Sequence, residues 1–213
     1  MVRYLKNKYV LLFLIFFLAV SLRFLWLSYP PQPVGIESIH IESAKNYLNF
    51  GSFAPDNWHT PPLKKLLLFF SIQLGGDNAF GWRFLNAFFG SLTITFLYLL
   101  CLELFSDRRI ASFASLILAI DPLHINFSRT SFEDIPATFF LIAATYFALL
   151  YLKKHTKAML LTSTTLYSLG MATRWYVLLP FLVFFYFYIK KSTFLKTNDN
   201  LIADTIGFFL LLP

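Results

Sequence analysis

Residues 82–105 read WRFLNAFFGSLTITFLYLLCLELF, an apolar run long enough to cross a lipid bilayer as one helix. The rest of the sequence has the same character, because 57% of its 213 residues are hydrophobic, 20% are aromatic and only 14% are charged. In water such a chain would expose too much nonpolar surface, whereas lipid requires only that backbone amides be bonded internally. The sequence therefore predicts an integral membrane protein with an all-α fold, in which residues 1–213 form a single transmembrane domain.

Further apolar runs lie on both sides of this segment. The first run is followed by Trp26, Tyr29 and proline-rich sequence, with no small-residue cleavage site, so we interpret it as an uncleaved span and not as a signal peptide. The expected architecture is a polytopic helical bundle of about six or seven spans. Apart from residues 82–105, the runs cover about 9–27, 110–125, 135–152, 158–173 and 175–189, with a last one that starts near Leu201 and in which the chain stops, at Pro213.

Lysine and arginine residues cluster at alternate ends of these runs. Positively charged loops are retained on the cytoplasmic side of a membrane, so the pattern predicts a cytoplasmic N-terminus. Acidic residues gather at the other ends, which we expect to be external. The basic set holds 11 of the 18 lysines and arginines: Arg3, Lys6, Lys8, Arg108, Arg109, Lys153, Lys154, Lys157, Lys190, Lys191 and Lys196. The acidic set holds 7 of the 11 acids: Glu37, Glu42, Asp56, Asp77, Asp121, Glu133 and Asp134.

The connection over residues 28–81 is the only long one between the predicted spans, and long loops are usually functional. Residues 36–49 have helical spacing. Residues 63–74 predict a short amphipathic or re-entrant helix, because their apolar stretch is too short to cross a bilayer. We therefore expect a long external loop that contains short interfacial helices.

Several functional classes are excluded by composition. The single cysteine, Cys101, allows no disulfide framework and no cysteine-based metal site. The net charge of +7 is scattered between apolar runs and forms no basic stripe, so nucleic acid is not an expected partner. The sequence contains no glycine-rich phosphate loop and no nucleophile elbow. Short outer loops without disulfides favour a prokaryotic plasma membrane.

Ionisable residues converge on the predicted external side. There a carboxylate could take a proton from an acceptor hydroxyl, while a cation or a bound metal stabilises a departing phosphate. Each residue also has a structural interpretation: Lys64 and Lys65 as lysines that reach to lipid headgroups, Arg174 as an interfacial anchor. The residues concerned are Glu37, His40, Glu42, His59, Lys64 and Lys65 in the long loop, Asp121, Arg129, Glu133 and Asp134 around the next outer turn, and Arg174 at the third. Glu37 with His40 could equally be a solvated helix face, and Arg129 with Asp134 an ion pair that locks two helix ends.

An ordered set of short motifs resembles the N-terminal half of the protein O-mannosyltransferase-like, or dolichyl-phosphate-mannose mannosyltransferase-like, glycosyltransferases. The related lipid A aminoarabinose transferases are similar. The motifs are the acidic stretch with its Tyr-Leu-x-x-Gly end (Glu37 to Gly51), Pro-Pro-Leu-x-Lys (Pro61 to Lys65), Gly-Trp-Arg (Gly81 to Arg83), Asp-Pro-Leu-His (Asp121 to His124), Ser-Arg with an aspartate five residues after the arginine (Ser128, Arg129, Asp134), and Gly-Met-Ala-Thr-Arg-Trp (Gly170 to Trp175).

The resemblance implies a C-type glycosyltransferase fold, whose first outer loop carries the active site. Such an enzyme takes a sugar from a polyprenyl phosphate and inverts its anomeric carbon. Carried onto this sequence, Glu37 occupies the second place of the family's Asp-Glu pair, and His59 or Thr60 the place of its histidine. The remaining matches are Lys65 to a lysine of the family, and Arg129 and Asp134 to the Arg and Asp of the second outer loop. Arg174 replaces a lysine of the family's motif and is a cation that could face the phosphate.

Two departures from the family pattern bear on activity. The first place of the Asp-Glu pair is Ile36, which can neither accept a proton nor bind a metal. Family members also continue with further spans, so we expect either a fragment, completed by a C-terminal partner chain, or a deteriorated copy. The alternative function is a catalytically inactive relative that binds lipid or supports a partner subunit. A transporter is less favoured, because the charges stand at span ends, with Arg23 as the exception.

The expected function is therefore membrane glycosyl transfer from a polyprenyl-phosphate-linked sugar to an acceptor on the external face. Glu37 is the predicted general base, supported by Glu42, with Asp134 as a further catalytic residue. The predicted substrate-binding residues are His40, His59, Lys65, Arg129 and Arg174. No cofactor is certain, although a divalent metal at Asp134 would also neutralise the leaving phosphate.

Overall fold

The computed structural model describes residues 8–51, 61–180, 182 and 186, and every regular element in this part of the chain is helical. This confirms the predicted all-α fold. The elements are α1 (Lys8–Phe24), α2 (Glu37–Phe50), α3 (Pro62–Gly75), α4 (Ala79–Phe105), α5 (Arg108–Ile120), α6 (Pro122–Ser128), α7 (Asp134–Lys154), α8 (Lys157–Met171) and a 3-10 turn, η2 (Trp175–Val177).

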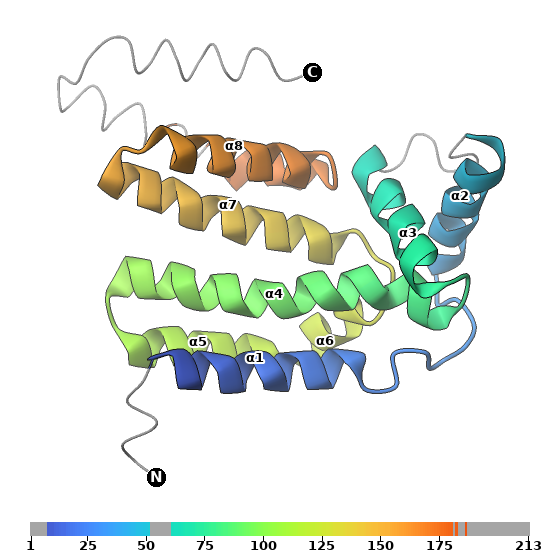
Figure 1. Ribbon diagram of the computed structural model, residues 1–213, viewed down its shortest axis with the longest axis horizontal. Coiled ribbons are helices and arrows are strands. Elements are labelled where there is room, and N and C mark those ends of the chain that lie inside the picture. Colours follow the sequence, from blue (N-terminus) through green and yellow to red (C-terminus); the bar gives the residue numbers. More distant parts are fainter. Residues whose placement is uncertain (1–7, 52–60, 181, 183–185, 187–213) are drawn as a thin grey trace.

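Helices α1, α4, α5, α7 and α8 lie side by side, and each runs opposite in direction to the one before it in this chain order (Figure 1). α8 packs on α7, α7 on α4, and α4 on both α1 and α5. α2 and α3 lie together across one end of this bundle, where α4 and α7 begin (Figure 1). We call this end the α2–α3 end. The helix ends at the opposite end of the bundle carry a group of cations: Arg108, Arg109, Lys153, Lys154 and Lys157.

Within the described residues, α4 and α7 are long and apolar enough to cross a membrane, and α5 with α6 would make a third span if the bent pair counts as one, so the six or seven spans expected are not shown. At 17 residues, α1 is shorter, and α8 has 15. Of the predicted runs, the one from Leu201 lies outside the described residues, and of residues 175–189 only the beginning is described. The two helices expected in the long connection are both present, as α2 and α3.

The run at residues 110–125 was expected to be one span, but the structure breaks it by 60° between α5 and α6. The cause is Pro122, which has no amide hydrogen and disfavours helical geometry at the residue before it. Asp121 accordingly is extended and caps α6 by accepting from the amide of His124 at 2.7 Å. The buried Arg23 guanidinium donates to the carbonyls of Ala119, at 3.1 Å, and Leu118, at 3.3 Å, near the end of α5. Arg23 thus satisfies carbonyl groups that the break leaves without a helical partner.

Phenylalanines account for much of the packing between α4 and α7. The ring of Phe89 lies 5.0 Å from that of Phe139 and 5.5 Å from that of Phe140, and Phe96 meets Phe139 edge-on at 5.6 Å. Aromatic pairs at these distances add to the stabilisation that burial provides. Part of the aromatic excess in the sequence therefore holds the central helices together.

The turn between α3 and α4 depends on the absence of a side chain at Gly81. A β-carbon there would collide with the Gly76 carbonyl oxygen and come within 2.9 Å of the Gly75 carbonyl carbon. Ser71 on α3 ties the same turn to α4, because its hydroxyl donates to the Gly81 carbonyl at 2.5 Å and accepts from the amide of Leu85 at 3.1 Å. The two helices can approach this closely only with glycine at position 81.

Gly81→Ala is therefore expected to destabilise the folded protein by about 1–3 kcal/mol, the usual cost of forcing extra volume into a packed site. The loss would be measured as a lower thermal midpoint of the detergent-solubilised protein. An unchanged midpoint would mean that α3 and α4 separate freely at this turn, contrary to the close packing described.

Candidate functional site

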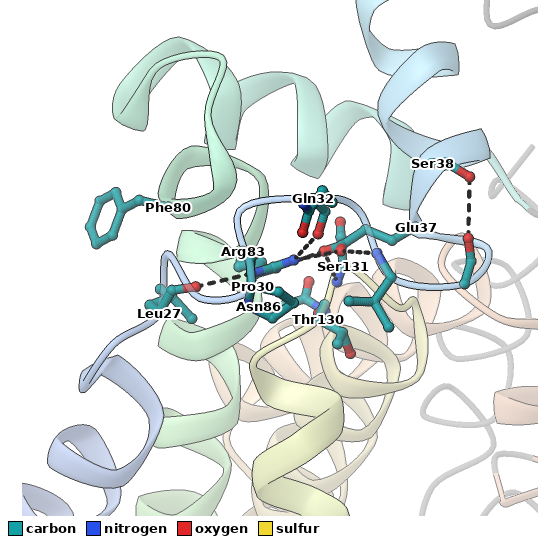
Figure 2. Close-up of polar contacts among 12 residues, drawn as sticks. Leu27, Pro30, Gln32, Glu37, Ser38, Phe80, Arg83, Asn86, Thr130 and Ser131 are labelled. Carbon is teal, nitrogen blue, oxygen red and sulfur yellow. Dashed lines mark hydrogen bonds and ion pairs between the residues drawn. The ribbon is translucent and has the colours of Figure 1, made fainter.

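A fully buried ion pair joins α2 to α4 at the α2–α3 end (Figure 2). The guanidinium of Arg83 donates to both carboxylate oxygens of Glu37, with Nε 3.1 Å from Oε1 and Nη2 3.0 Å from Oε2. Arg83 also donates to the backbone carbonyls of Leu27, Pro30 and Gln32, at 3.2, 2.8 and 3.0 Å. Arg83 therefore fixes both α2 and the connection that leads to it from α1.

Glu37 makes two further contacts. Its carboxylate accepts from the backbone amides of Val34 and Ser131, each at 2.9 Å (Figure 2). Together with Arg83, these donors engage both lone-pair directions of each carboxylate oxygen. A carboxylate whose oxygens are all engaged in this way is not directed toward a substrate. The geometry of Glu37 is that of a residue that orders its surroundings.

The connection between α6 and α7 is held by side chains from the neighbouring helices. The Asn86 amide group on α4 donates to the carbonyls of Thr130 and Phe132, at 2.6 Å each. The ammonium of Lys64 on α3 donates to the Asn86 carbonyl oxygen at 3.1 Å and to the Ser131 hydroxyl at 3.0 Å. These bonds fix residues 130–132, and the next two residues are the carboxylates Glu133 and Asp134.

Those two carboxylates share the cation of Arg174, which follows α8. Arg174 Nη1 lies 3.2 Å from Glu133 Oε1, and its Nε donates to Asp134 Oδ1 at 3.2 Å. On the other side of Glu133, His40 Nε2 of α2 lies 3.1 Å from Oε2. The amide of Leu63 donates to the Ala172 carbonyl at 3.1 Å, so α3 begins beside this group. We call His40, Glu133, Asp134 and Arg174 the outer cluster.

Burial and charge differ within the outer cluster. Glu133 and His40 are buried, whereas the side chains of Asp134 and Arg174 are 37% and 36% exposed. Burial acts to raise the pKa of Glu133, but the hydrogen bond and charge of His40 and the charge of Arg174 prevail and lower it to about 2. Glu133 is therefore an anion at any working pH and a weak proton acceptor. Asp134 and Arg174 are the members that a ligand could reach.

The predicted site residues divide into two groups. The structure brings His40, Asp134 and Arg174 together, with Glu37 linked to them through Ser131. Of the others, Glu42 is exposed on α2 and takes part in none of the described ion pairs, Arg129 donates to the Trp26 carbonyl at 2.9 Å, and Lys65 is buried on α3. His59 lies outside the described residues.

The donor set around Asp134 does not favour a metal ion. Within residues 8–51 and 61–180, no three histidine, cysteine, aspartate or glutamate side chains are grouped so as to hold one. The carboxylates of Glu133 and Asp134 face the guanidinium of Arg174.

Two residues with central positions here, Arg83 and Asn86, were not singled out as site residues from the sequence. Lys64 and Glu133 were noted among the ionisable residues of the predicted external side but received no catalytic or binding role. Adjacent carboxylates directly before an apolar run, as at Glu133 and Asp134, are a signal that could have given Glu133 such a role. For Asn86 the sequence offers only a polar residue inside an apolar helix, which is a weak signal.

The sequence model of the dolichyl-phosphate-mannose-protein mannosyltransferase family matches residues 59–213. An uncharacterised protein of Aquifex aeolicus (strain VF5) is 27% identical over 184 residues. That alignment covers 82% of this chain but only 37% of the relative, so the chain spans little more than a third of the length of the curated protein it matches. No solved structure matches the chain.

Proposed function

The chain belongs to the dolichyl-phosphate-mannose-protein mannosyltransferase family, and from that premise we propose that it acts in sugar transfer from a polyprenyl-phosphate donor to an acceptor on the external face of a membrane. The family match supports the donor class and the glycosyltransferase activity. The sugar, the acceptor and the part of the reaction that this chain performs are our proposal.

The observation that carries the proposal is the outer cluster. Four side chains meet at the end of the bundle where the long connection lies. The carboxylates of Glu133 and Asp134 come from the start of α7, the cation of Arg174 follows α8, and His40 comes from α2. Asp134 and Arg174 are partly exposed there, so an anionic donor and a hydroxyl acceptor could reach them. A cation next to a carboxylate suits a reaction in which a phosphate departs while a proton is taken up.

In the proposed step the acceptor hydroxyl oxygen attacks the anomeric carbon of the donor sugar. A carbon–oxygen bond forms, and the bond between the anomeric carbon and the phosphate oxygen breaks with inversion. The phosphate leaves with the bonding electrons as polyprenyl phosphate, stabilised by Arg174. The hydroxyl proton passes to the Asp134 carboxylate, since Glu133 is too weak a base and Glu37 is fully engaged. The assignment of Glu37 as base stays a prediction, and its test is given in the Discussion.

The proposed membrane arrangement is based on the cations at the helix ends opposite α2 and α3. The end that carries Arg108, Arg109 and Lys153 would face the cytoplasm, as would the N-terminus, and the α2–α3 end would face outward. Residues 28–81 then form the external loop of a single transmembrane domain. Because α1, α4, α5 with α6, α7 and α8 alternate in direction in chain order, we propose that each of them crosses the membrane as part of the six or seven spans expected, in a prokaryotic plasma membrane.

Loss of the Arg174 cation is expected to slow transfer by about 10–100-fold, because the departing phosphate loses its stabilising charge. The measurement is sugar transfer by membranes that contain equal amounts of wild type and Arg174→Met. Arg174→Lys should retain part of the rate, since lysine keeps the positive charge but cannot reproduce the paired contacts of the guanidinium with Glu133 and Asp134. Arg109→Met, at the opposite end of the bundle, is the matched control. An Arg174→Met variant as fast as wild type would remove Arg174 from the mechanism.

A second candidate function is a non-catalytic lipid-binding or partner subunit. Two observations favour it: the acid expected before Glu37 is Ile36, and Glu37 itself is fully paired with Arg83 and backbone amides. Under this alternative, wild-type membranes transfer no sugar, whether or not a partner chain that completes the bundle is supplied. Transfer by the wild type that depends on Arg174 would exclude it.

A further inference from the structure

Lys64 is a buried cation near the outer cluster, and none of its described hydrogen bonds goes to a carboxylate. Its side chain is 1% exposed, and its two hydrogen-bond acceptors, the Asn86 carbonyl and the Ser131 hydroxyl, are both neutral. Burying an ammonium without a paired anion is costly. A lysine that served only to stabilise the fold would be a poor choice for this position.

The charges that face Lys64 come from every element around it. Glu37 lies on α2, Glu133 and Asp134 stand at the start of α7, and all three attract its ammonium through space. Arg83 pairs with Glu37, and Arg174 pairs with both Glu133 and Asp134. Lys64 therefore sits at the electrostatic centre of the site although it does not reach the exposed surface.

The hydrogen bonds of Lys64 converge on one short segment. Ser131 accepts from Lys64 through its hydroxyl and donates its amide to Glu37 at 2.9 Å, while Asn86, the other acceptor of Lys64, holds the carbonyls on either side of Ser131. The segment 129–133 is thus clamped from α2, α3 and α4. Glu133 and Asp134 follow directly, so a shift of Ser131 would move both carboxylates relative to Arg174.

We propose that Lys64 is a positioning residue for the transfer reaction: through Asn86 and Ser131 it fixes residues 129–133, and thereby aims the carboxylates of Glu133 and Asp134. This inference rests on the proposed function. Lys64 does not contact substrate in this assignment. It acts by holding the segment in the one arrangement in which Asp134 and Arg174 face each other.

The proposed role of Lys64 predicts a characteristic pH dependence, because its hydrogen bonds depend on its protonation. Burial lowers the pKa of Lys64 from its ordinary 10.5 to about 8, against the pull of Glu133, Glu37 and Asp134. Between about pH 8 and 10.5 the folded protein therefore binds fewer protons than the unfolded chain, so stability rises with pH across that window, and below it the charged lysine lowers stability. The clamp, in contrast, needs the ammonium and weakens as the pH rises through about 8.

The deciding experiment is hydrogen–deuterium exchange of the detergent-solubilised full chain, followed for the amides of residues 129–133. We expect Lys64→Met to exchange there about tenfold faster than wild type at pH 7, while its thermal midpoint falls by no more than about 3 °C, because removal of the buried charge offsets the lost hydrogen bonds. Lys45→Met is the matched control, since Lys45 pairs with Asp77 on the surface of the same end, 2.7 Å apart. Unchanged exchange in Lys64→Met overturns the inference.

The steady-state kinetics of sugar transfer provide a second test of the role of Lys64. Lys64→Met should lower kcat for sugar transfer by up to about 100-fold with little change in the KM for the polyprenyl-phosphate sugar, as expected when catalytic groups are misplaced. The wild-type rate should decline as the pH passes about 8, and Lys64→Arg should retain activity without that decline, because a guanidinium stays charged. An active wild type with an equally fast Lys64→Met overturns the inference, whereas an inactive wild type overturns the proposed function and leaves the exchange measurement to decide the role of Lys64.

Discussion

Arg83→Met is expected to destabilise the folded protein by about 3–5 kcal/mol, since removing one partner of a buried ion pair strands the other charge. Glu37 is 0% exposed and would keep only its two backbone donors. The carbonyls of Leu27, Pro30 and Gln32 would lose their donor as well. For a chain of this length the loss corresponds to a fall of roughly 10 °C in the thermal midpoint of the detergent-solubilised protein.

The control for this prediction is the double variant Arg83→Met with Glu37→Gln. It removes both charges, so it should be more stable than Arg83→Met alone although less stable than wild type, and the difference measures the coupling between the two side chains. If Arg83→Met alone loses less than about 1 kcal/mol, the pair must be reached by water, in conflict with its burial.

Most of the helical scaffold could be predicted from the sequence, because apolar length and periodicity are local properties. The run beginning at Trp82 became α4, and the helices expected around residues 36–49 and 63–74 are α2 and α3. The main difference lies at Pro122. Mean hydropathy over a window is insensitive to a single proline. The backbone hydrogen bonding of a helix is not, because Pro122 has no amide hydrogen with which to continue the helix. Hence one expected span is a pair of helices bent by 60°.

The candidate site could be located but not assembled from the sequence. That acidic and basic residues would gather at alternate ends of the spans follows from the ordering of the runs. Which of them pair does not, because the partners are far apart in the chain: Arg83 is 46 residues from Glu37, and Arg174 is 40 from Asp134. The sequence suggested Arg129 as the partner of Asp134, whereas in the structure Asp134 pairs with Arg174 and Arg129 binds a backbone carbonyl.

The predicted role of Glu37 illustrates the same limit. A carboxylate in an outer loop next to a histidine has the right chemistry for a base, and nothing local shows that four donors surround it. Burial together with a bidentate arginine turns the same residue type into an anchor. Asp134 differs from Glu37 in exposure and in having one shared cation, and both properties come from tertiary packing.

Asp134→Asn is accordingly expected to have the largest effect on activity. The amide keeps the size of the side chain but cannot accept the acceptor's proton, so transfer should fall by about 10²–10⁴-fold, the usual contribution of a general base. The assay is sugar transfer in membranes, normalised to the amount of folded protein. Asp77→Asn is the matched control, because Asp77 is a carboxylate at the same end that pairs with Lys45 outside the outer cluster.

Glu37→Gln separates the two base assignments in the same assay. If Asp134 is the base, Glu37→Gln lowers the yield of folded protein, because Arg83 loses its counter-charge, but the rate per folded molecule falls far less than in Asp134→Asn. If Glu37 is the base, the order reverses: Glu37→Gln abolishes transfer by protein that is still folded, and Asp134→Asn remains active. Because the transfer rate is normalised to folded protein, the comparison reports on catalysis and not on stability. The two carboxylates should differ in this assay because Glu37 is fully hydrogen-bonded, whereas Asp134 is partly exposed.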